Sequence, residues 1–195
     1  MEKKGGKKTT KPKKRGRPPE DGRKKLEVRT IVRTALLLID RNGVSGFTMR
    51  GLALELNVDP MAIYHYVPDK QSLLRILADD LFGKLPLKED LDWKKQIRNF
   101  ARSYSDLVSK HPNFAYQLLI NPVESKPLSR ANEFLLDALR AGGIAEKKRR
   151  ICSHTIVDYL NGFALAGLSP GIAVKAMEES LEIIFSGIEQ LYISA

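Results

Sequence analysis

Apolar side chains recur every three or four residues along most of this chain of 195 residues, which is the spacing of amphipathic α-helices. Beyond residue 91 no stretch shows the period-two alternation of a half-buried strand, and no hairpin turn signal occurs. Prolines and glycines separate the helical stretches of this half, which cover about 92–110, 112–120, 127–141, 145–167 and 171–193. The pattern therefore predicts an all-α fold.

The pattern before residue 85 predicts a long helix, two short helices and a fourth helix that leads away from them. The long helix covers about residues 24–41, and Thr48, Asp59 and Asp69 are good N-caps for the three that follow. Asn57 stands between the two short helices, and asparagine tolerates the left-handed conformation that closes a helix. Two short helices joined by a tight turn are the layout of a helix-turn-helix, whose second helix enters the DNA major groove.

The second short helix has an unusual outward face. Ile63 and Val67 lie four residues apart and can pack inward. The side chains left facing mostly outward are Pro60, Met61, Ala62, Tyr64 and His65, with Tyr66 and Lys70 just beyond. A merely solvated helix would carry glutamate and lysine there, so this face favours DNA recognition. The alternative is a structural corner, because such corners also occur in all-α proteins that never contact DNA.

Residues from about Arg23 to Leu85 resemble the DNA-binding domain of the TetR family of bacterial transcriptional regulators. The matching positions are Gly46-Phe47-Thr48, Leu52-Ala53, Val58, Ile63-Tyr64-His65-Tyr66-Val67, Asp69-Lys70 and Leu73-Leu74. The resemblance covers about a third of the chain. It implies an N-terminal three-helix head that contains the helix-turn-helix, followed by a C-terminal helical domain for effector binding and dimerisation.

The resemblance also implies roles for single side chains. The positions that hold phosphates in the family are occupied here by Thr48, Tyr64, Tyr66 and Lys70. Arg50 stands at a position that reaches a base edge in some members. The residues that lie where the operator is read are Pro60, Met61, Ala62 and His65. Two departures are Asn57, where many members carry glycine, and Val67, where phenylalanine is usual.

The charge of the chain, formally +10, is unevenly placed. Residues 1–22 hold 9 Lys or Arg against 3 Asp or Glu, and residues 23–85 hold 10 against 7. The remaining 110 residues hold 14 against 13 and are nearly neutral. The basic excess therefore coincides with the predicted head and the segment before it, as phosphate neutralisation requires.

Residues 1–22 are rich in Lys, Gly and Pro and contain almost no large apolar side chain, which predicts a disordered basic arm. No apolar stretch follows the charges, so a secretory signal is not expected. Lys14-Arg15-Gly16-Arg17-Pro18 resembles the core of an AT-hook, in which Arg15 and Arg17 would insert into a narrow A·T-rich minor groove. The alternative is a solubilising tail that binds any polyanion.

Residues 86–195 are expected to form the ligand-binding and dimerisation domain. The last two helical stretches carry broad apolar faces, and two such helices from each subunit would make a four-helix bundle. The residues of these faces include Ile151, Ile156, Leu160, Met177, Leu181, Ile184, Ile188 and Leu191. The alternative is that these helices only complete the core of one subunit. A dimer is also expected because one short recognition helix reads few bases.

The same domain is expected to enclose a pocket for an unidentified small organic effector. The candidate lining residues combine aromatic and polar side chains: Phe100, Tyr104, Phe114, Tyr116, Gln117, Asn121, His154 and Asn161. Aromatic side chains at helical spacing are also consistent with a plain core. His111–Pro122 and Leu135–Ile144 resemble the effector domain of the tetracycline repressor branch, but the drug- and magnesium-coordinating residues of that branch are not matched, so tetracycline is not implied.

The sequence does not favour an enzyme, a metalloprotein or a membrane-spanning protein. Cys152 is a lone cysteine in an apolar helical context, and His65, His111 and His154 show no metal-ligand spacing. No phosphate-binding loop, dinucleotide fingerprint or nucleophile elbow occurs, and no apolar run reaches the ~18 residues that span a bilayer. No cofactor or metal is expected.

The resulting prediction is a cytoplasmic, nucleoid-associated regulator of transcription that acts as a homodimer. It would repress by binding a palindromic double-stranded operator and would release it when a small molecule binds the C-terminal domain. Two alternatives remain open. One is an architectural DNA binder without sequence preference, and the other is an interaction adaptor whose basic arm contacts anionic membrane.

Overall fold

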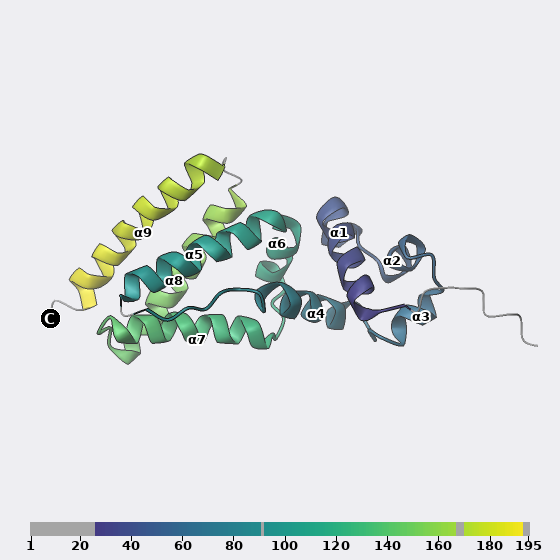
Figure 1. Ribbon diagram of the computed structural model, residues 1–195, viewed down its shortest axis with the longest axis horizontal. Helices are drawn as coiled ribbons and strands as arrows, with labels where there is room; N and C mark the ends of the chain where they lie inside the picture. The colour runs from purple at the N-terminus through teal and green to yellow at the C-terminus, as the bar shows by residue number, and fades with distance from the viewer. Residues whose placement is uncertain (1–25, 91, 167–169, 193–195) are drawn as a thin grey trace, which may run out of the picture.

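The computed structural model describes residues 26–90, 92–166 and 170–192, and in these ranges every regular element is a helix. Arg15 and Arg17 lie outside the described residues, as does the rest of the predicted arm. Figure 1 shows an elongated molecule with α2 and α3 at one end and α9 at the other. The helices are α1 (Val28–Gly46), α2 (Met49–Glu55), α3 (Pro60–Tyr64), α4 (Lys70–Phe82), α5 (Trp93–Lys110), α6 (Pro112–Ile120), α7 (Lys126–Ala141), α8 (Glu146–Leu165) and α9 (Pro170–Tyr192).

The head consists of α1–α4, and side-chain caps fix where its short helices begin. The Thr48 hydroxyl accepts a hydrogen bond from the Gly51 amide at 2.9 Å. The carboxylates of Asp59 and Asp69 accept from the amides of Met61 at 2.7 Å and Ser72 at 2.6 Å. Each cap satisfies a donor that the first turn of a helix leaves without a partner. The three predicted helix starts are thereby confirmed.

Two residues with positive φ shape the chain around these helices. Gly43, at φ 70°, interrupts α1 near its C-terminal end, two residues after the predicted end of this helix at about residue 41. Asn57, at φ 52°, makes the turn between α2 and α3. Asparagine adopts this conformation at a smaller cost than most side chains, which fits the turn that the sequence predicts at this position.

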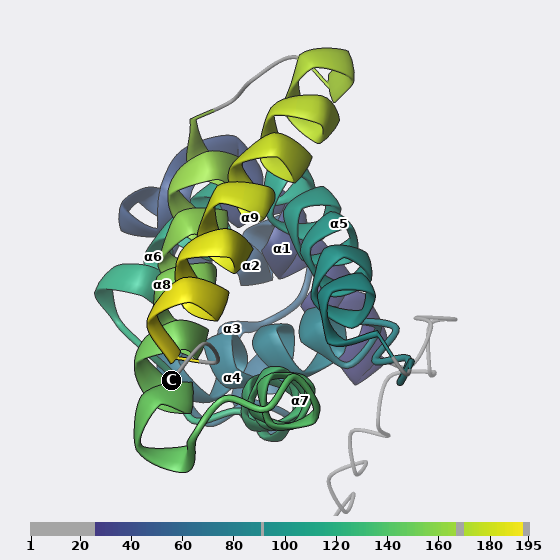
Figure 2. The ribbon, with the colours of Figure 1, turned by 90° about the vertical axis from the view of Figure 1, so that its left-hand side faces the viewer.

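The C-terminal part consists of α5–α9. α5, α7 and α8 pack on one another, and α9 lies against α5 and α8 (Figure 2). Ion pairs join α9 to α5: Lys94 contacts Glu189 at 2.7 Å, Arg98 contacts Glu182, and Arg102 contacts Glu178. None of the helices in the described ranges combines the length and the apolar character that a membrane span needs.

Most of the apolar residues predicted as a dimer face are in fact buried within one subunit. Ile156, Leu160, Met177, Leu181 and Ile188 all belong to the main hydrophobic core. For them the alternative interpretation, completion of the subunit core, is correct. Among the side chains of α8 and α9 whose burial the structure describes, the large apolar ones that are exposed are Ile151, Ile183 and Leu191.

The end of α7 packs closely against the start of α5. The rings of Trp93 and Phe185 meet edge-on with centroids 5.2 Å apart. Gly142, at the end of α7, lies so near the Trp93 ring that a Cβ there would stand 2.8 Å from ring carbons. A glycine is therefore required for this contact, because a side chain would displace the indole.

The largest contacts between the head and the C-terminal helices are made by two pairs of helices, and the rings of Phe82 on α4 and Tyr104 on α5 add a further contact, with centroids 6.0 Å apart. In the first pair, α1 packs against α6, where the His111 imidazole Nδ1 lies 2.7 Å from an Asp40 carboxylate oxygen and the Asn113 amide donates to the Asp40 carbonyl at 2.9 Å. In the second pair, α4 packs against α7, and the Ser125 hydroxyl donates to the Asp79 carboxylate at 2.6 Å. One hydrophobic core runs through both parts.

Candidate DNA interface and effector cavity

The outward face of α3 is formed as the sequence predicts. Ile63 and Val67 are fully buried, and they hold the short helix against the rest of the head. On the opposite side Met61, Tyr64 and Tyr66 are 63%, 40% and 38% exposed. His65, which ends α3, is also exposed, whereas Pro60 and Ala62 are half-buried. A surface with two phenols, an imidazole and a thioether offers hydrogen-bonding and apolar groups to a base edge or a phosphate.

The start of α2 contributes two further predicted DNA contacts. Arg50 is exposed, and its guanidinium forms no described ion pair. Thr48 is exposed too, but its hydroxyl oxygen already accepts the Gly51 amide, which leaves the O–H free to donate to a phosphate. Next to them Arg41 and Glu55 form an exposed ion pair at 3.4 Å.

Lys70 has a structural function that the sequence did not reveal. Its ammonium donates to the backbone carbonyls of Val44 at 2.9 Å and Phe47 at 3.1 Å, and it lies 5.6 Å from the centre of the Phe47 ring. These bonds tie the start of α4 to the segment between α1 and α2. An ammonium group has three N–H donors, so one remains for a phosphate.

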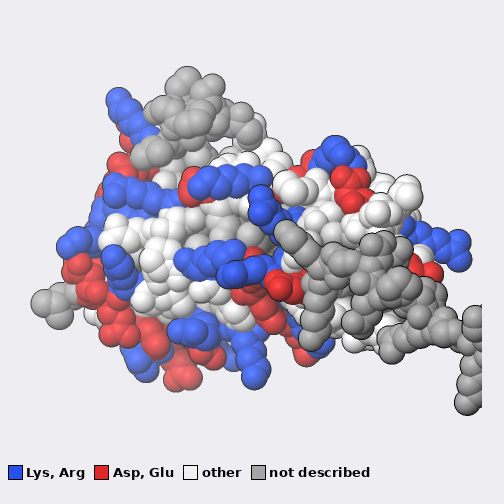
Figure 3. Space-filling view, turned by 45° about the vertical axis from the view of Figure 1, so that its right-hand side comes forward, with Lys and Arg blue, Asp and Glu red and all other residues white. Residues whose placement is uncertain are grey.

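The described part of the head carries no net charge. Residues 26–85 hold 7 Lys or Arg and 7 Asp or Glu, so the +3 of residues 23–85 comes from Arg23, Lys24 and Lys25. Basic and acidic side chains are interspersed over the face that Figure 3 shows. The basic excess of the whole chain therefore lies almost entirely in residues 1–25, which the structure does not describe.

A cavity of about 150 Å³ lies between α5, α7 and α8. Its aromatic wall is the stacked pair Phe100 and Tyr104, with ring centroids 5.6 Å apart. The Tyr104 hydroxyl donates to the side-chain oxygen of Asn161 at 2.5 Å. Burial raises the pKa of Tyr104 to about 12, so this phenol stays protonated at neutral pH. The other lining residues are Leu128, Ala131, Asn132, Leu135, His154, Val157 and Asp158.

The structure brings together half of the residues predicted to line the effector pocket. Phe100, Tyr104 and His154 line the cavity, and Asn161 contacts Tyr104. The other four lie on α6 or at its end: Phe114 is buried in the core, Gln117 is half-buried, and Tyr116 and Asn121 are exposed. The cavity residues that were not predicted follow helical spacing, at 128, 131, 132 and 135 on α7 and at 157 and 158 on α8, one turn from the predicted His154. That spacing also fits a plain core, so it could not be told apart from one.

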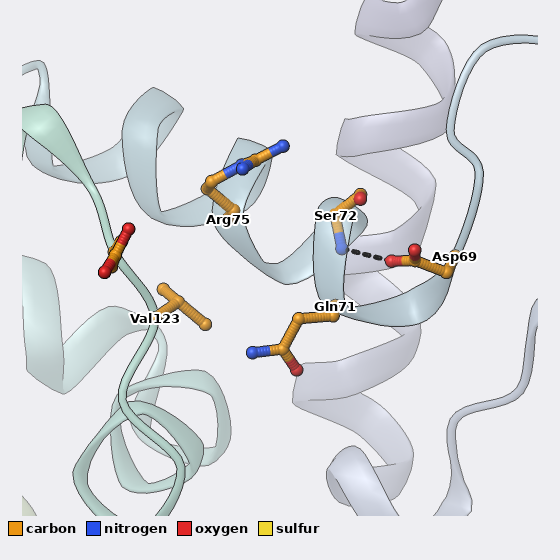
Figure 4. A pocket seen from close by; sticks show the side chains of 6 residues that line it. Asp69, Gln71, Ser72, Arg75 and Val123 are labelled. Atoms are coloured by element: carbon orange, nitrogen blue, oxygen red, sulfur yellow. Dashed lines mark hydrogen bonds between the residues drawn. The ribbon is translucent and has the colours of Figure 1, made fainter.

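A second hollow, of about 270 Å³, lies between the start of α4 and the segment after α6 (Figure 4). Asp69, Gln71 and Arg75 face Val123 across it. The amide of Ser72 donates to the Asp69 carboxylate, and this bond lowers the pKa of Asp69. The hollow opens to solvent beside the contact between α4 and α7.

Other chemistry is weakly represented in the described residues. They contain no group of three or more His, Cys, Asp or Glu that could hold a metal ion. Cys152 is buried, and burial raises the pKa of its thiol, which disfavours the reactive thiolate.

Comparison with known proteins places this geometry among bacterial regulators. The family model described as bacterial regulatory proteins, tetR family, matches residues 31–77. An HTH-type transcriptional regulator of Saccharopolyspora erythraea is 28% identical over 150 residues, which are 75% of this chain and 64% of that protein. The HTH-type transcriptional repressor DrrR1 of Streptomyces coeruleorubidus is 27% identical over 157 residues, 78% of this chain and 58% of the repressor.

Among solved structures, the crystal structure of BioQ with its natural double-stranded DNA operator superimposes with a TM-score of 0.71. It is 27% identical, and the match covers 84% of this chain and 98% of that one. The chain thus matches nearly the whole of a solved regulator but about three fifths of the length of the two curated relatives.

Proposed function

The chain belongs to the TetR family of bacterial regulatory proteins, and we propose that it is a homodimeric repressor whose operator is released when a small molecule binds the C-terminal part. The proposed operator is a palindrome of double-stranded DNA, because a two-fold symmetric dimer presents two recognition helices in inverted orientation. Regulators of this family bind DNA and are not enzymes. Binding to an operator would place the protein in the bacterial cytoplasm, at the nucleoid.

The observation that carries this proposal is the exposed face of α3 on its buried support. Ile63 and Val67 anchor the helix, and Met61, Tyr64 and His65 stand outward at one end of the molecule. Thr48 and Arg50 at the start of α2 are exposed and free to donate hydrogen bonds to DNA. BioQ, which is similar over nearly all of its length, was crystallised on its own operator, and this supports the same use of the head here.

We propose that the dimer forms through α8 and α9. Ile151, Ile183 and Leu191 are large, apolar and exposed on these two helices, with Ile183 exposed to 74%. A second copy of the same surface would bury them in a four-helix bundle.

Release would follow from the contacts between the head and the C-terminal helices. A ligand in the cavity touches α5, α7 and α8, and α7 packs on α4. The dimer has one conformation in which the recognition helices are spaced for the operator and one in which they are not. A ligand that binds the second conformation more tightly weakens operator binding, by the difference between its affinities for the two conformations.

A fluorescence anisotropy titration on duplexes that tile the DNA upstream of the gene tests the proposal. We expect one tile to bind at least about a thousandfold more tightly than scrambled DNA at near-physiological salt. A variant with Tyr64→Ala and His65→Ala should lose this preference, and Tyr116→Ala, which removes an exposed aromatic from α6, should keep it.

A second candidate function is architectural DNA binding without sequence preference. The observation that favours it is the charge distribution, with 12 Lys or Arg against 3 Asp or Glu in residues 1–25 and a balanced head beyond them. In that case all tiles should bind equally, and affinity should fall steeply with salt. Removing residues 1–25 should then abolish binding, whereas a repressor should keep its preferred tile with reduced affinity.

A further inference from the structure

The cavity between α5, α7 and α8 has an uneven distribution of polar groups. Its inner wall is apolar and aromatic, whereas the polar lining residues are Asn132 on α7 and His154 and Asp158 on α8. His154 and Asp158 are four residues apart, so they lie one turn apart on the same face of α8. Both are exposed, which places them at the mouth of the cavity.

Asp158 brings a negative charge to this mouth, and nothing in the described residues neutralises it. No described hydrogen bond or ion pair involves its carboxylate, and none of the nine lining residues is a lysine or an arginine. Two arginines on the helices of the cavity already have partners. Arg102 on α5 forms an ion pair with Glu178, and Arg149 on α8 donates to the carbonyl of Ile144.

The aromatic wall has the complementary property. The Tyr104 hydroxyl donates its proton to Asn161, so it has no donor left for a ligand. Phe100 and Tyr104 stack on each other and form an apolar, uncharged aromatic surface on one side of the cavity. The Tyr104 phenol is neutral at physiological pH, and burial raises its pKa further, so the wall adds no charge of its own.

The size of the cavity limits the ligand further. About 150 Å³ is the volume of a protein cavity that holds benzene. The space therefore fits one six-membered ring or a short aliphatic chain, with a polar group directed to the mouth.

From these observations we infer that the effector is a small organic amine, a cation whose apolar body lies against Phe100 and Tyr104 and whose ammonium group donates to Asp158. Such a ligand places its apolar body on the aromatic wall and makes a charge-assisted hydrogen bond to the unpaired carboxylate. An organic acid of the same size would meet the Asp158 charge and find no lysine or arginine among the lining residues. The inference names the ligand class for the cavity of the proposed function and rests on that function for its regulatory meaning.

Three probes of one shape and different charge test the inference by isothermal titration calorimetry on the full-length protein without DNA. They are 2-phenylethylamine, 2-phenylethanol and phenylacetate. We expect the amine to bind at least about fivefold more tightly than the alcohol, and phenylacetate to bind most weakly. Equal affinities, a preference for the alcohol or the acid, or no saturable binding of the amine at millimolar concentration overturns the inference.

Two variants test whether the preference for the amine over the alcohol depends on Asp158. Asp158→Asn should reduce amine affinity to that of the alcohol while alcohol binding persists, which shows that the variant is folded. Glu146→Gln removes the other carboxylate of α8, in its exposed first turn, and should leave the preference unchanged. A preference for the amine that survives Asp158→Asn overturns the assignment.

Failure of this inference and failure of the proposed function give different results. If the amine does not bind but one duplex is still preferred in the anisotropy titration, the inferred ligand class is wrong and the proposal of a sequence-specific repressor is retained. If the amine binds with the expected selectivity but no duplex is preferred, the amine site is retained and the proposal of a repressor is wrong.

Discussion

The side chains of the head that are proposed to contact DNA all come from one continuous stretch, Thr48 to Lys70, whereas the cavity is lined from Phe100 to Asp158 by three separate helices. In the head, α2, α3 and α4 each start at a capping side chain that accepts a hydrogen bond from an amide only two or three residues further along the chain. In the cavity, Tyr104 and Asn161 meet although 57 positions separate them. Local chemistry therefore builds the first site, and packing between distant helices builds the second.

The largest expected effect tests whether the head depends on its buried support. Ile63→Ala removes a fully buried side chain from the five-residue α3, and the free energy of unfolding should fall by about 2–5 kcal/mol. Operator binding should be lost with it. Met61→Ala, on the exposed side of the same helix, should change stability by less than about 0.5 kcal/mol while still weakening the operator complex. Denaturant unfolding and anisotropy measure both, and equal destabilisation by the two variants would contradict the assigned faces.

The next largest expected effect is a loss of stability at alkaline pH, and it comes from Tyr104 in the wall of the cavity. The pKa of Tyr104 is raised by burial from 10.0 to about 12, so the folded state holds the proton more tightly than the unfolded state. The contribution of this phenol to the free energy of unfolding is fully present below pH 10 and is lost as the pH rises towards 12. The loss should be on the order of 2 kcal/mol. Unfolding at several pH values should show a shallower decline for Tyr104→Phe than for the natural chain, and parallel declines would refute the burial of this phenol.

Lys70 gives a smaller effect that separates structure from recognition within the head. Lys70→Met removes the donor to the Val44 and Phe47 carbonyls, and stability should fall by about 1–2 kcal/mol. If the third N–H contacts a phosphate, the slope of log affinity against log salt should also fall by about 0.9. We expect both changes. A lower stability with an unchanged salt slope would assign Lys70 to the fold alone.

The smallest effect concerns the junction of the two regions. A double-mutant cycle with Asp40→Asn and His111→Ala should give a coupling of about 1 kcal/mol, because both side chains are mostly shielded from solvent. The exposed pair Lys110 and Asp106 provides the control, with a coupling below about 0.5 kcal/mol. A junction coupling no larger than the control would mean that this contact does not connect the head to α6.

The same contrast explains what could be predicted from the sequence. Caps, prolines and the Asn57 turn are local signals, and the predicted helix starts at Thr48, Asp59 and Asp69 are those of the structure. The helices beyond residue 91 also begin and end within a few residues of the predicted positions. The outward face of α3 followed from the spacing of Ile63 and Val67, since both must be buried.

The remaining features depend on which helices become neighbours. Met177, Leu181 and Ile188 form an apolar face whether it meets a second subunit or the core of their own, and only the packing of α9 on α5 and α8 decides between them. Asp158 and the α7 residues of the cavity carry no local mark of a binding site. The two carbonyl acceptors of Lys70 lie more than 20 positions earlier, at Val44 and Phe47, so a phosphate contact was the only role its sequence neighbourhood suggested.

The position of Trp93 determines what intrinsic fluorescence can report. It is the only tryptophan of the chain, and it lies between Gly142 at the end of α7 and Phe185 on α9. Figure 1 shows α9 at the opposite end of the molecule from α2 and α3. The emission of Trp93 therefore monitors the docking of α9 and the end of α7, and a head that melts alone leaves it unchanged. Circular dichroism sees every helix. Melting curves that coincide in the two signals would show one cooperative unit, and an early loss of ellipticity at constant emission would show the head unfolding first.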